Sequence, residues 1–215
     1  MSIAVTCSDL DFTWPSGESV FTGLNFTAST GSTGLIGLNG SGKSTLLKLI
    51  AGELLPADGS IRITGQVGYL PQDFTLEAGL RVDEVLRIAT IRTALHAVER
   101  GEASEQNIST VGENWDVEER ALAMLSRLGL EHIGLDRRVD ELSGGESVLL
   151  GVAAELLKQP AVLLLDEPTN NLDLDARTRL YDAVATFKGA MLIVSHDREL
   201  LDLVDQIADL RGGDV

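Results

Sequence analysis

Strand-like patterns occupy the front of the chain. Residues 3–36 place β-branched and aromatic side chains between turn signals such as Pro15-Ser16-Gly17, in the stretches IAVTC, LDFTW, SVFTGLNFTA and STGLI. KSTLLKLIA at 43–51 predicts a helix, and the runs at 61–63 and 67–70 predict two further strands. We therefore expect a β-rich front section that contains one helix.

Helical spacing of apolar residues dominates from about 82 to 158. The stretches that show it are VDEVLRIATIRTALHAVER, DVEERALAMLSRLGL and ESVLLGVAAELLK. Asp116 is expected to cap the second helix and Gly129 to close it. The polar stretch GEASEQNISTVGEN between the first two helices is expected to be an exposed linker.

Beyond residue 160 the pattern alternates between strand and helix. AVLLL at 161–165 and AMLIV at 190–194 are continuous apolar runs, which suit parallel strands buried on both faces. A helix is expected between them, over about 174–187. The chain therefore predicts an α/β core that holds a helical insertion, with extra β structure at the front.

Composition fits a globular protein of one domain or two small ones. The chain has 215 residues, of which 44% are hydrophobic and 23% charged. No apolar run approaches the roughly 18–20 residues that cross a bilayer, and the N-terminus lacks the features of a signal peptide. The single Cys7 is expected to be a small buried side chain in a reducing compartment. We therefore expect a cytoplasmic protein without direct membrane insertion.

The charge of the chain is strongly negative. Asp and Glu number 33 against 17 Lys and Arg, a formal net charge of −16. This balance argues against a direct grip on a nucleic-acid backbone by this domain alone, since such binding rewards clustered Lys and Arg. A magnesium–nucleotide ligand remains compatible with this charge, because a local group of phosphate-binding residues can overcome the negative electrostatic field of the whole molecule.

A glycine-rich loop follows the predicted strand STGLI. Residues 37–45 read GLNGSGKST, which fits the pattern G-x-x-x-x-G-K-[ST] between a strand and a helix. Its glycines let backbone N–H groups turn toward phosphate oxygens, and the following helix N-terminus favours negative charge. Lys43 is expected to reach the β- and γ-phosphates, and the Ser44 hydroxyl to bind Mg²⁺. The nucleotide-binding residues predicted here are Gly37, Asn39, Gly40, Ser41, Gly42, Lys43, Ser44 and Thr45.

Two acids end the apolar strand in VLLLDEPTNNLD at 162–173. Open α/β sheets place their ligands at the carboxyl ends of their strands. Asp166 is expected to hold Mg²⁺ through water, and Glu167 to orient and deprotonate an attacking water. Acids are also common where a strand simply ends at solvent, but the phosphate loop favours the functional interpretation.

His196 and Gln72 also follow predicted strands. His196 comes after AMLIV and is expected to contact the γ-phosphate, whereas His96 and His132 have no such context and are assigned no role. Gln72 in GYLPQD is expected to reach Mg²⁺ or the water and to link the nucleotide to the helical insertion.

Trp14 is a candidate for stacking on an adenine ring. It is the last residue of the second predicted strand, LDFTW, and precedes the turn signal PSG. A core aromatic is the alternative interpretation, and Phe12, which shares a face with Trp14, could share or replace the stacking role.

A second anion-binding pattern begins the helix near 144. In LSGGE a small hydroxyl residue and two glycines expose backbone at a helix start, which is a place to hold an anion. The residues alone do not say which phosphate this second loop would hold.

In order and spacing, these motifs resemble those of the ATP-binding cassette (ABC) ATPases over essentially the whole chain. The resemblance rests on GLNGSGKST, YLPQD, LSGGE, VLLLDEP, the NLD loop and SHDRE. It implies one nucleotide-binding domain over 1–215, built on a P-loop NTPase core with an antiparallel β region and a helical subdomain at about 73–145. It also implies ATP hydrolysis with ATP and Mg²⁺ bound. The roles implied are metal binding by Ser44, Gln72 and Asp166, catalysis by Glu167, His196, Lys43 and Gln72, contact with a partner's ATP by Ser143, Gly144, Gly145 and Glu146, and a D-loop role for Asp173.

DEPTNNLD, SHDRELLD and DVEERALAMLSRLGL further resemble the ABC-F subfamily, whose members carry two cassettes and act mainly on ribosomes. The resemblance implies that the chain is the first cassette of a longer protein, with a second cassette and the ribosome as partners in translation or antibiotic resistance. Asn171 departs from the pattern, where the common form has histidine. An energy subunit bound to a membrane permease and a nucleotide-gated binding module with little turnover are the competing interpretations.

Overall fold

The described residues of this computed structural model, 2–170 and 172–210, form two compact units. The sheet unit combines Met1–Phe74, Lys158–Asn170 and Leu180–Val215, and the helical unit combines Thr75–Leu157 and Asn171–Arg179. Asn171, the departure from the subfamily pattern, lies outside the described residues. None of the described helices is both long and apolar enough to span a membrane.

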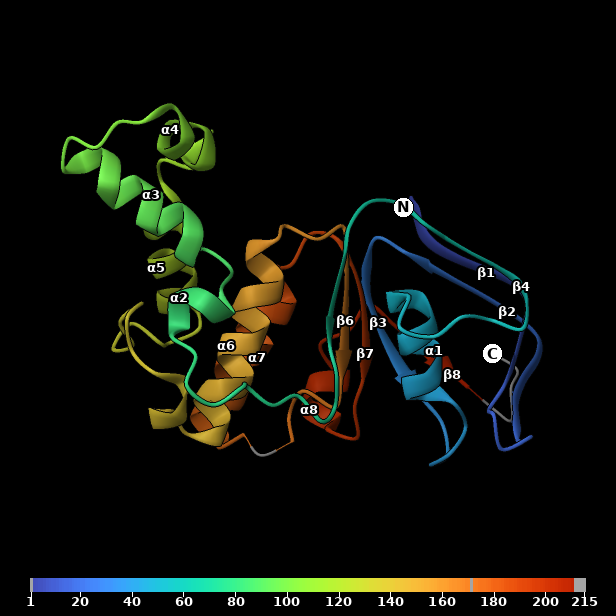
Figure 1. Cartoon of the computed structure of the whole chain (residues 1–215). Helices are drawn as coiled ribbons and strands as arrows, with labels where there is room; N and C mark the ends of the chain where they lie inside the picture. The colour runs from blue at the N-terminus through green and yellow to red at the C-terminus, as the bar shows by residue number, and fades with distance from the viewer. Residues whose placement is uncertain (1, 171, 211–215) are drawn as a thin grey trace. The chain divides into compact units, whose positions relative to one another are not determined.

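An antiparallel sheet forms the front of the sheet unit. Its described strands are β1 (Ile3–Thr13), β2 (Ser19–Ser29) and β4 (Asp58–Ile63), in the order β2-β1-β4 (Figure 1). The sequence predicts two short strands where the structure has the single strand β1. The pairing register shifts between Cys7 and Leu10, around Asp9 with its φ of 48°, so an irregularity joins the two halves of one strand.

A parallel sheet forms the rest of the unit. Its described strands are β3 (Gly31–Ile36), β5 (Val67–Leu70), β6 (Val162–Asp166), β7 (Ala190–Val194) and β8 (Gln206–Asp209), in the order β5-β6-β7-β3-β8. Every residue of β6 and β7 is buried, as their continuous apolar runs predict. The expected fold class, an α/β core with an antiparallel β region, is confirmed.

Three helices accompany these strands: α1 (Lys43–Ala51), α7 (Leu174–Thr186) and α8 (Arg198–Leu201). Helix α1 contacts β5, β6 and β7, and its ends agree with the predicted residues 43–51. Helix α7 begins in the helical unit and continues into the sheet unit after Arg179. The short helix α8 and the strand β8 follow β7 and complete the alternation of strand and helix that is predicted beyond residue 160.

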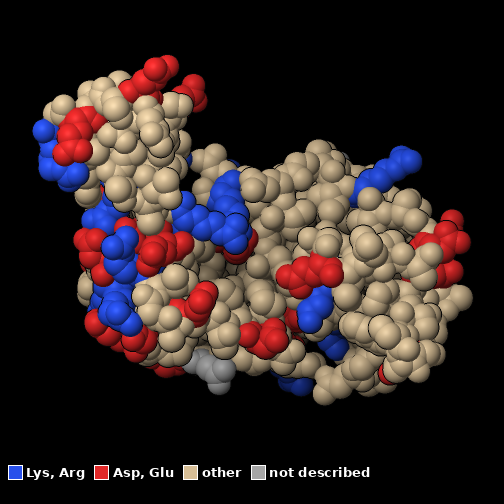
Figure 2. Space-filling view, in the orientation of Figure 1, with Lys and Arg blue, Asp and Glu red and all other residues tan. Residues whose placement is uncertain are grey.

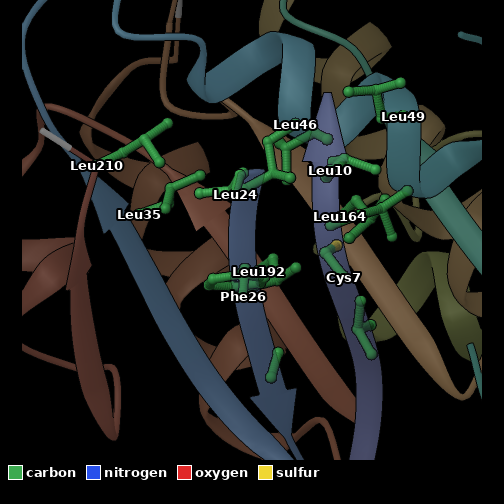
Figure 3. Close-up of a cluster of buried hydrophobic side chains, with 14 of the residues drawn as sticks. Cys7, Leu10, Leu24, Phe26, Leu35, Leu46, Leu49, Leu164, Leu192 and Leu210 are labelled. Carbon is green, nitrogen blue, oxygen red and sulfur yellow. The ribbon is translucent and has the colours of Figure 1, made fainter. Parts of the chain in front are cut away.

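The hydrophobic core of the sheet unit joins the two sheets and α1. Figure 3 shows side chains from all three meeting in one cluster. The labelled members are Cys7, Leu10, Leu24, Phe26, Leu35, Leu46, Leu49, Leu164, Leu192 and Leu210. Burying one such leucine contributes roughly 1.5–3 kcal/mol, so this cluster holds the carboxyl ends of β3, β6 and β7 in a fixed arrangement.

The helical unit contains α2 (Val82–Val85), α3 (Ala89–Glu99), α4 (Glu105–Val111), α5 (Val117–Arg127), a 3-10 turn (Val139–Glu141) and α6 (Gly144–Leu157). Three local expectations were wrong. The helix expected from 82 is interrupted at Arg87, whose φ is 59°. The expected linker contains α4, which Ser104 caps by accepting a hydrogen bond from Asn107 N. Asp116 makes no side-chain capping hydrogen bond in the described structure and instead pairs with Arg120 at 3.1 Å.

Arg92 links several elements of the helical unit. Its guanidinium contacts Asp83 at 3.0 Å, Asp136 at 2.9 Å and also Glu118. Asp83 is 2% exposed, so its charge depends on this arginine and on Arg81, 3.1 Å away. Figure 2 shows acidic and basic side chains lying next to each other on the visible face of this unit. Ion pairs therefore supplement the apolar packing of the helical unit.

Candidate functional site

A cavity of about 530 Å³ lies in the sheet unit, and most of the predicted nucleotide-binding residues line it. Those that do are Trp14, Asn39, Gly40, Gly42, Lys43, Ser44 and Thr45, and the predicted catalytic residues Gln72, Glu167 and His196 line it as well. Most of these residues come from the loop after β3 and from the segments that follow β5, β6 and β7 in the parallel sheet, whereas Trp14 directly follows β1. The volume falls within the range of about 300–1,000 Å³ that is usual for small-molecule sites.

The glycine-rich loop reaches helix α1 through a left-handed residue. Gly42 has φ of 94°, and a Cβ there would lie 2.6 Å from Cγ1 of Val20 and 2.7 Å from the Phe21 ring. Only glycine satisfies both the backbone angle and this close approach. Helix α1 begins at the next residue, so its free N–H groups and its dipole face the cavity side of the loop.

Lys43 lies folded over the loop. Its Nζ donates hydrogen bonds to the carbonyl oxygens of Gly37 at 2.9 Å and Leu38 at 3.0 Å, and the residue is 8% exposed. Because both acceptors are neutral, the ammonium charge remains unneutralised by any acid in these two bonds. The lysine is therefore positioned to attract an anion into the loop.

Ser44 and Asp166 form a pair beneath the cavity. The Ser44 hydroxyl donates to Asp166 Oδ1 at 3.0 Å, and Asp166 is 1% exposed. Burial raises the pKa of Asp166, while the Ser44 hydrogen bond and the nearby Lys48 and Lys43 oppose that rise. A buried carboxylate beside a hydroxyl is a suitable donor set for Mg²⁺, which prefers oxygen ligands and keeps several waters. No cluster of three or more His, Cys, Asp or Glu that could hold a metal occurs in the described part of the chain.

Glu167 occupies a strained position at the end of β6. Its φ of 49° is uncommon for a residue with a side chain, and its N–H donates to the Val194 carbonyl of β7 at 2.8 Å. The residue is 9% exposed, and burial raises the pKa of its carboxyl group. Glu167 Oε1 lies 3.3 Å from Nε2 of His196, which is the closest described basic group. The backbone thus holds this carboxylate at the cavity rather than letting it turn to solvent.

Trp14 lines the cavity, and Phe12 does not. The two rings meet edge to face, with centroids 4.9 Å apart and an interplanar angle of 85°. Phe12 is 6% exposed and belongs to the core, so of these two aromatics Trp14 is the one that lies at the cavity. Strand β1 ends at Thr13, so the two aromatics no longer share one face as their spacing suggested.

Two predicted residues lie beside a different cavity. Gly37 and Ser41 line a space of about 610 Å³ together with Asp209 and Leu210. The Ser41 hydroxyl is buried and has no hydrogen-bond partner among the described residues.

Sequence reasoning also missed lining residues of the first cavity, namely Glu18, Val20, Asn170 and Val194. Only Asn170, in DEPTNN, carried a sequence signal.

A second candidate site lies wholly within the helical unit. Its cavity of about 540 Å³ is lined by Ser143, Gly144, Gly145, Glu146 and Asp173, the residues of LSGGE and of the predicted D-loop. Asp173 Oδ1 accepts a hydrogen bond from Ala176 N at 2.8 Å and so caps the start of α7. His132 and Arg179, which sequence reasoning did not assign, line the same cavity.

A capping box opens α6. The Ser143 N–H donates to Glu146 Oε2 at 2.7 Å, and the Glu146 N–H donates to Ser143 Oγ at 3.2 Å. The other carboxylate oxygen, Oε1, lies 2.6 Å from Nε2 of His132. The hydrogen bond to His132 and those to Ser143 lower the pKa of Glu146 to about 2.

Gly129 allows Arg179 to approach the same cavity. A Cβ on Gly129 would lie 1.9 Å from Nε of Arg179, and its φ is 69°. The glycine that was expected to close α5 therefore also seats the guanidinium against the backbone. The cavity beside Ser143 thus has an arginine on one side and a histidine on another.

Comparisons with known proteins agree with this geometry. The family model described as ABC transporter matches residues 21–170. The tylosin resistance ATP-binding protein TlrC of Streptomyces fradiae is 38% identical over 192 residues, 79% of this chain and 35% of that protein. The probable ATP-binding protein YheS of Escherichia coli K12 is 38% identical over 170 residues, 78% of this chain and 23% of that protein.

The fold also matches a solved structure. It is a dimeric post-hydrolysis state of the ATP-binding cassette MJ0796 bound to ADP and phosphate, with a TM-score of 0.76 at 23% identity. The match covers 98% of this chain and 96% of that chain. By contrast, this chain spans only about a third of the length of TlrC and about a quarter of that of YheS.

Proposed function

This chain belongs to the ABC transporter family, and on that premise we propose that it is a cassette that binds and hydrolyses ATP in a pair with a second cassette. The observation that carries the proposal is the first cavity, where Lys43, Ser44 and Glu167 line one space. A phosphate cradle, a metal-binding hydroxyl and a buried base are the parts that phosphoryl transfer to water needs.

The loop at 37–45 would hold the phosphates. Its backbone N–H groups and the start of α1 favour negative charge, and Lys43 already lies over the loop carbonyls. Trp14, which lines the cavity and meets Phe12 edge to face, would stack on the base. Mg²⁺ held by Ser44, Asp166 and Gln72 would neutralise phosphate charge.

Glu167 would act as the general base. Burial raises its pKa, which makes the carboxylate a stronger proton acceptor than an exposed glutamate. Its left-handed backbone and its hydrogen bond to Val194 fix the direction from which it accepts the proton of a water. His196, 3.3 Å from that carboxylate, would hold its orientation and contact the γ-phosphate.

Pairing would complete the site. Ser143, Gly144 and Gly145 begin α6 and line a cavity of their own, so their backbone would be offered to the ATP of a partner. The solved cassette that this fold matches is dimeric and holds ADP and phosphate, which supports action in pairs. Asp173 would lie at the same junction as the D-loop.

The wider role that we propose is that of an ABC-F type factor acting on the ribosome, in translation or antibiotic resistance. It is supported by the sequence motifs and by the 38% identity to a protein described as a tylosin resistance ATP-binding protein. The same fold also serves in transporters, so a permease is the competing partner. Stimulation of phosphate release by purified ribosomes would favour the first role, and its absence would favour the second.

The catalytic assignment is tested by Glu167→Gln. We expect phosphate release to fall about 10²- to 10⁴-fold, because general-base catalysis is lost while the loop still binds ATP. Sedimentation with ATP should then show an accumulated pair, which ADP does not produce. Glu77→Gln, an exposed position away from the first cavity, is the control and should hydrolyse normally. Undiminished turnover in Glu167→Gln would refute the assignment of the base.

A further inference from the structure

His132 makes a contact that the mechanism above does not use. It belongs to the segment after α5, fourteen residues before Glu146, yet its Nε2 lies 2.6 Å from Glu146 Oε1. The other oxygen of that carboxylate accepts the Ser143 N–H in the capping box. One carboxylate therefore ties His132 to the loop that carries Ser143, Gly144 and Gly145.

This arrangement has an electrostatic consequence. Glu146 places a negative charge in the first turn of α6, where the free N–H groups would otherwise attract a phosphate. A second anion approaching Ser143 would be repelled by that charge unless a cation lies against it. His132 is bonded to the carboxylate oxygen that faces away from the capping box, so it can offset the charge without disturbing the cap.

Ser143 stays available to a ligand in this geometry. Its Oγ accepts the Glu146 N–H at 3.2 Å, and a hydroxyl that accepts one hydrogen bond can still donate another. The cap therefore fixes the position of the Ser143 oxygen and leaves its proton free to turn toward the cavity.

We propose that His132 is a positioning residue of the LSGGE loop, which holds Glu146 in the capping box and offsets its charge where the phosphate of a partner's nucleotide approaches. The inference rests on the proposed function, since that phosphate belongs to the paired cassette.

Other charged groups line or adjoin the same cavity. Arg179 lies on α7, the acids Asp173 and Asp175 lie at its start, and Glu131 precedes His132 in the chain. These groups are unchanged in the His132 variants, so differences among those variants report on His132.

The first measurement is ATP-induced pairing by sedimentation, in a Glu167→Gln background so that ATP persists. We expect His132→Ala to weaken pairing about three- to tenfold, the range for losing part of a cap and an ion pair. His132→Gln keeps a hydrogen-bond donor for Glu146, so this variant should recover most of the pairing that His132→Ala loses.

The coupling is tested by removing the carboxylate charge. In Glu146→Gln, the further change His132→Ala should have little effect, because there is no longer a charge to offset. His96→Ala is the matched control, since His96 pairs with Glu118 at 3.0 Å elsewhere in the helical unit. Equal losses from His132→Ala in both backgrounds, or an equal loss in the control, would overturn the proposal.

A second measurement does not depend on ATP. Amide hydrogen exchange in the nucleotide-free chain should be faster at Ser143 and Glu146 in His132→Ala, by about three- to tenfold, and unchanged in His96→Ala. If the Glu167→Gln parent fails to pair with ATP, the proposed function is wrong, while the exchange rates still test whether His132 holds the cap. Unchanged exchange at both amides in His132→Ala would refute the positioning role by itself.

Discussion

At the scale of single residues, burial sets the chemistry of three ionisable groups in the sheet unit. Glu167 and Asp166 are buried acids at the end of β6, and Cys7 is a buried thiol on β1 in the core that supports that strand. Burial disfavours the charged form of each group, so the pKa of each is raised. For Glu167, the proposed base, this favours proton transfer, whereas for Cys7 it makes the thiol inert.

Cys7 gives a stability prediction with a definite sign. Burial raises its pKa from 9.0 to about 11, so the folded state keeps a proton that the unfolded state releases. This contribution is fully present below pH 9 and is lost as the pH rises toward 11, by about 2–3 kcal/mol. Urea unfolding of the chain at pH 8 and pH 10.5 measures it. Cys7→Ala should show a shallower pH dependence, and identical slopes in the two proteins would contradict the assignment.

At the scale of elements, Arg92 holds the helical unit together. It lies on α3 and reaches Asp83 on α2, Glu118 on α5 and Asp136 in the loop before the 3-10 turn. Helix α2 has only four residues, and the left-handed backbone at Arg87 separates it from α3. Neither helix is therefore long enough to be stable by itself. The contacts of the Arg92 guanidinium therefore connect α2, α3 and α5, where no continuous helix does so.

We expect Arg92→Ala to lower the free energy of unfolding of the helical unit by about 2–4 kcal/mol, because Asp83 is left buried with only Arg81 as its partner. The loss of stability in Arg92→Lys should be smaller than in Arg92→Ala. Lysine keeps the positive charge but lacks the planar guanidinium that contacts several acids at once. Urea unfolding in a Trp14→Phe background, where the remaining Trp115 reports on this unit, gives the values. Asp136→Asn, at an exposed acid, should cost less than about 1 kcal/mol, and an equal loss there would contradict the role of burial.

The same elements show how much the sequence could predict. The strands β6 and β7 and the helix α1 were predicted nearly residue by residue, because continuous apolar runs and the glycine loop define them locally. Helix α4 was missed because most of its residues are polar, and only Val111 is buried. Glu167 and His196 in the first cavity followed from the ends of predicted strands, whereas the lining residues Glu18 and Val20 carried no sequence signal. The bond from His132 to Glu146 did not, since it depends on the packing of the segment after α5 against α6.

At the scale of the whole molecule, the net charge disfavours nucleic acid as a direct partner, whereas the local charge of the first cavity suits a nucleotide. A formal net charge of −16 disfavours a direct nucleic-acid grip by this domain, yet Lys43 gives the first cavity a local cation. The residues proposed for catalysis line one cavity and the LSGGE residues line another, in different units of the chain. If the proposed ribosome contact includes RNA, it would therefore have to be made by local basic groups and not by the acidic surface of this domain.

The two cavities give the last prediction, which concerns pairing between copies. Lys43→Ala removes the loop cation, and Ser143→Arg fills the LSGGE cavity, so each variant alone should hydrolyse little ATP. A mixed pair keeps one intact site, built from the loop of the Ser143→Arg copy and the LSGGE residues of the Lys43→Ala copy. Mixing equal amounts should therefore restore up to about a quarter of normal phosphate release if sites act independently. The double variant mixed with itself is the control, and mixed pairs that form without restoring activity would mean that each site is completed within one chain.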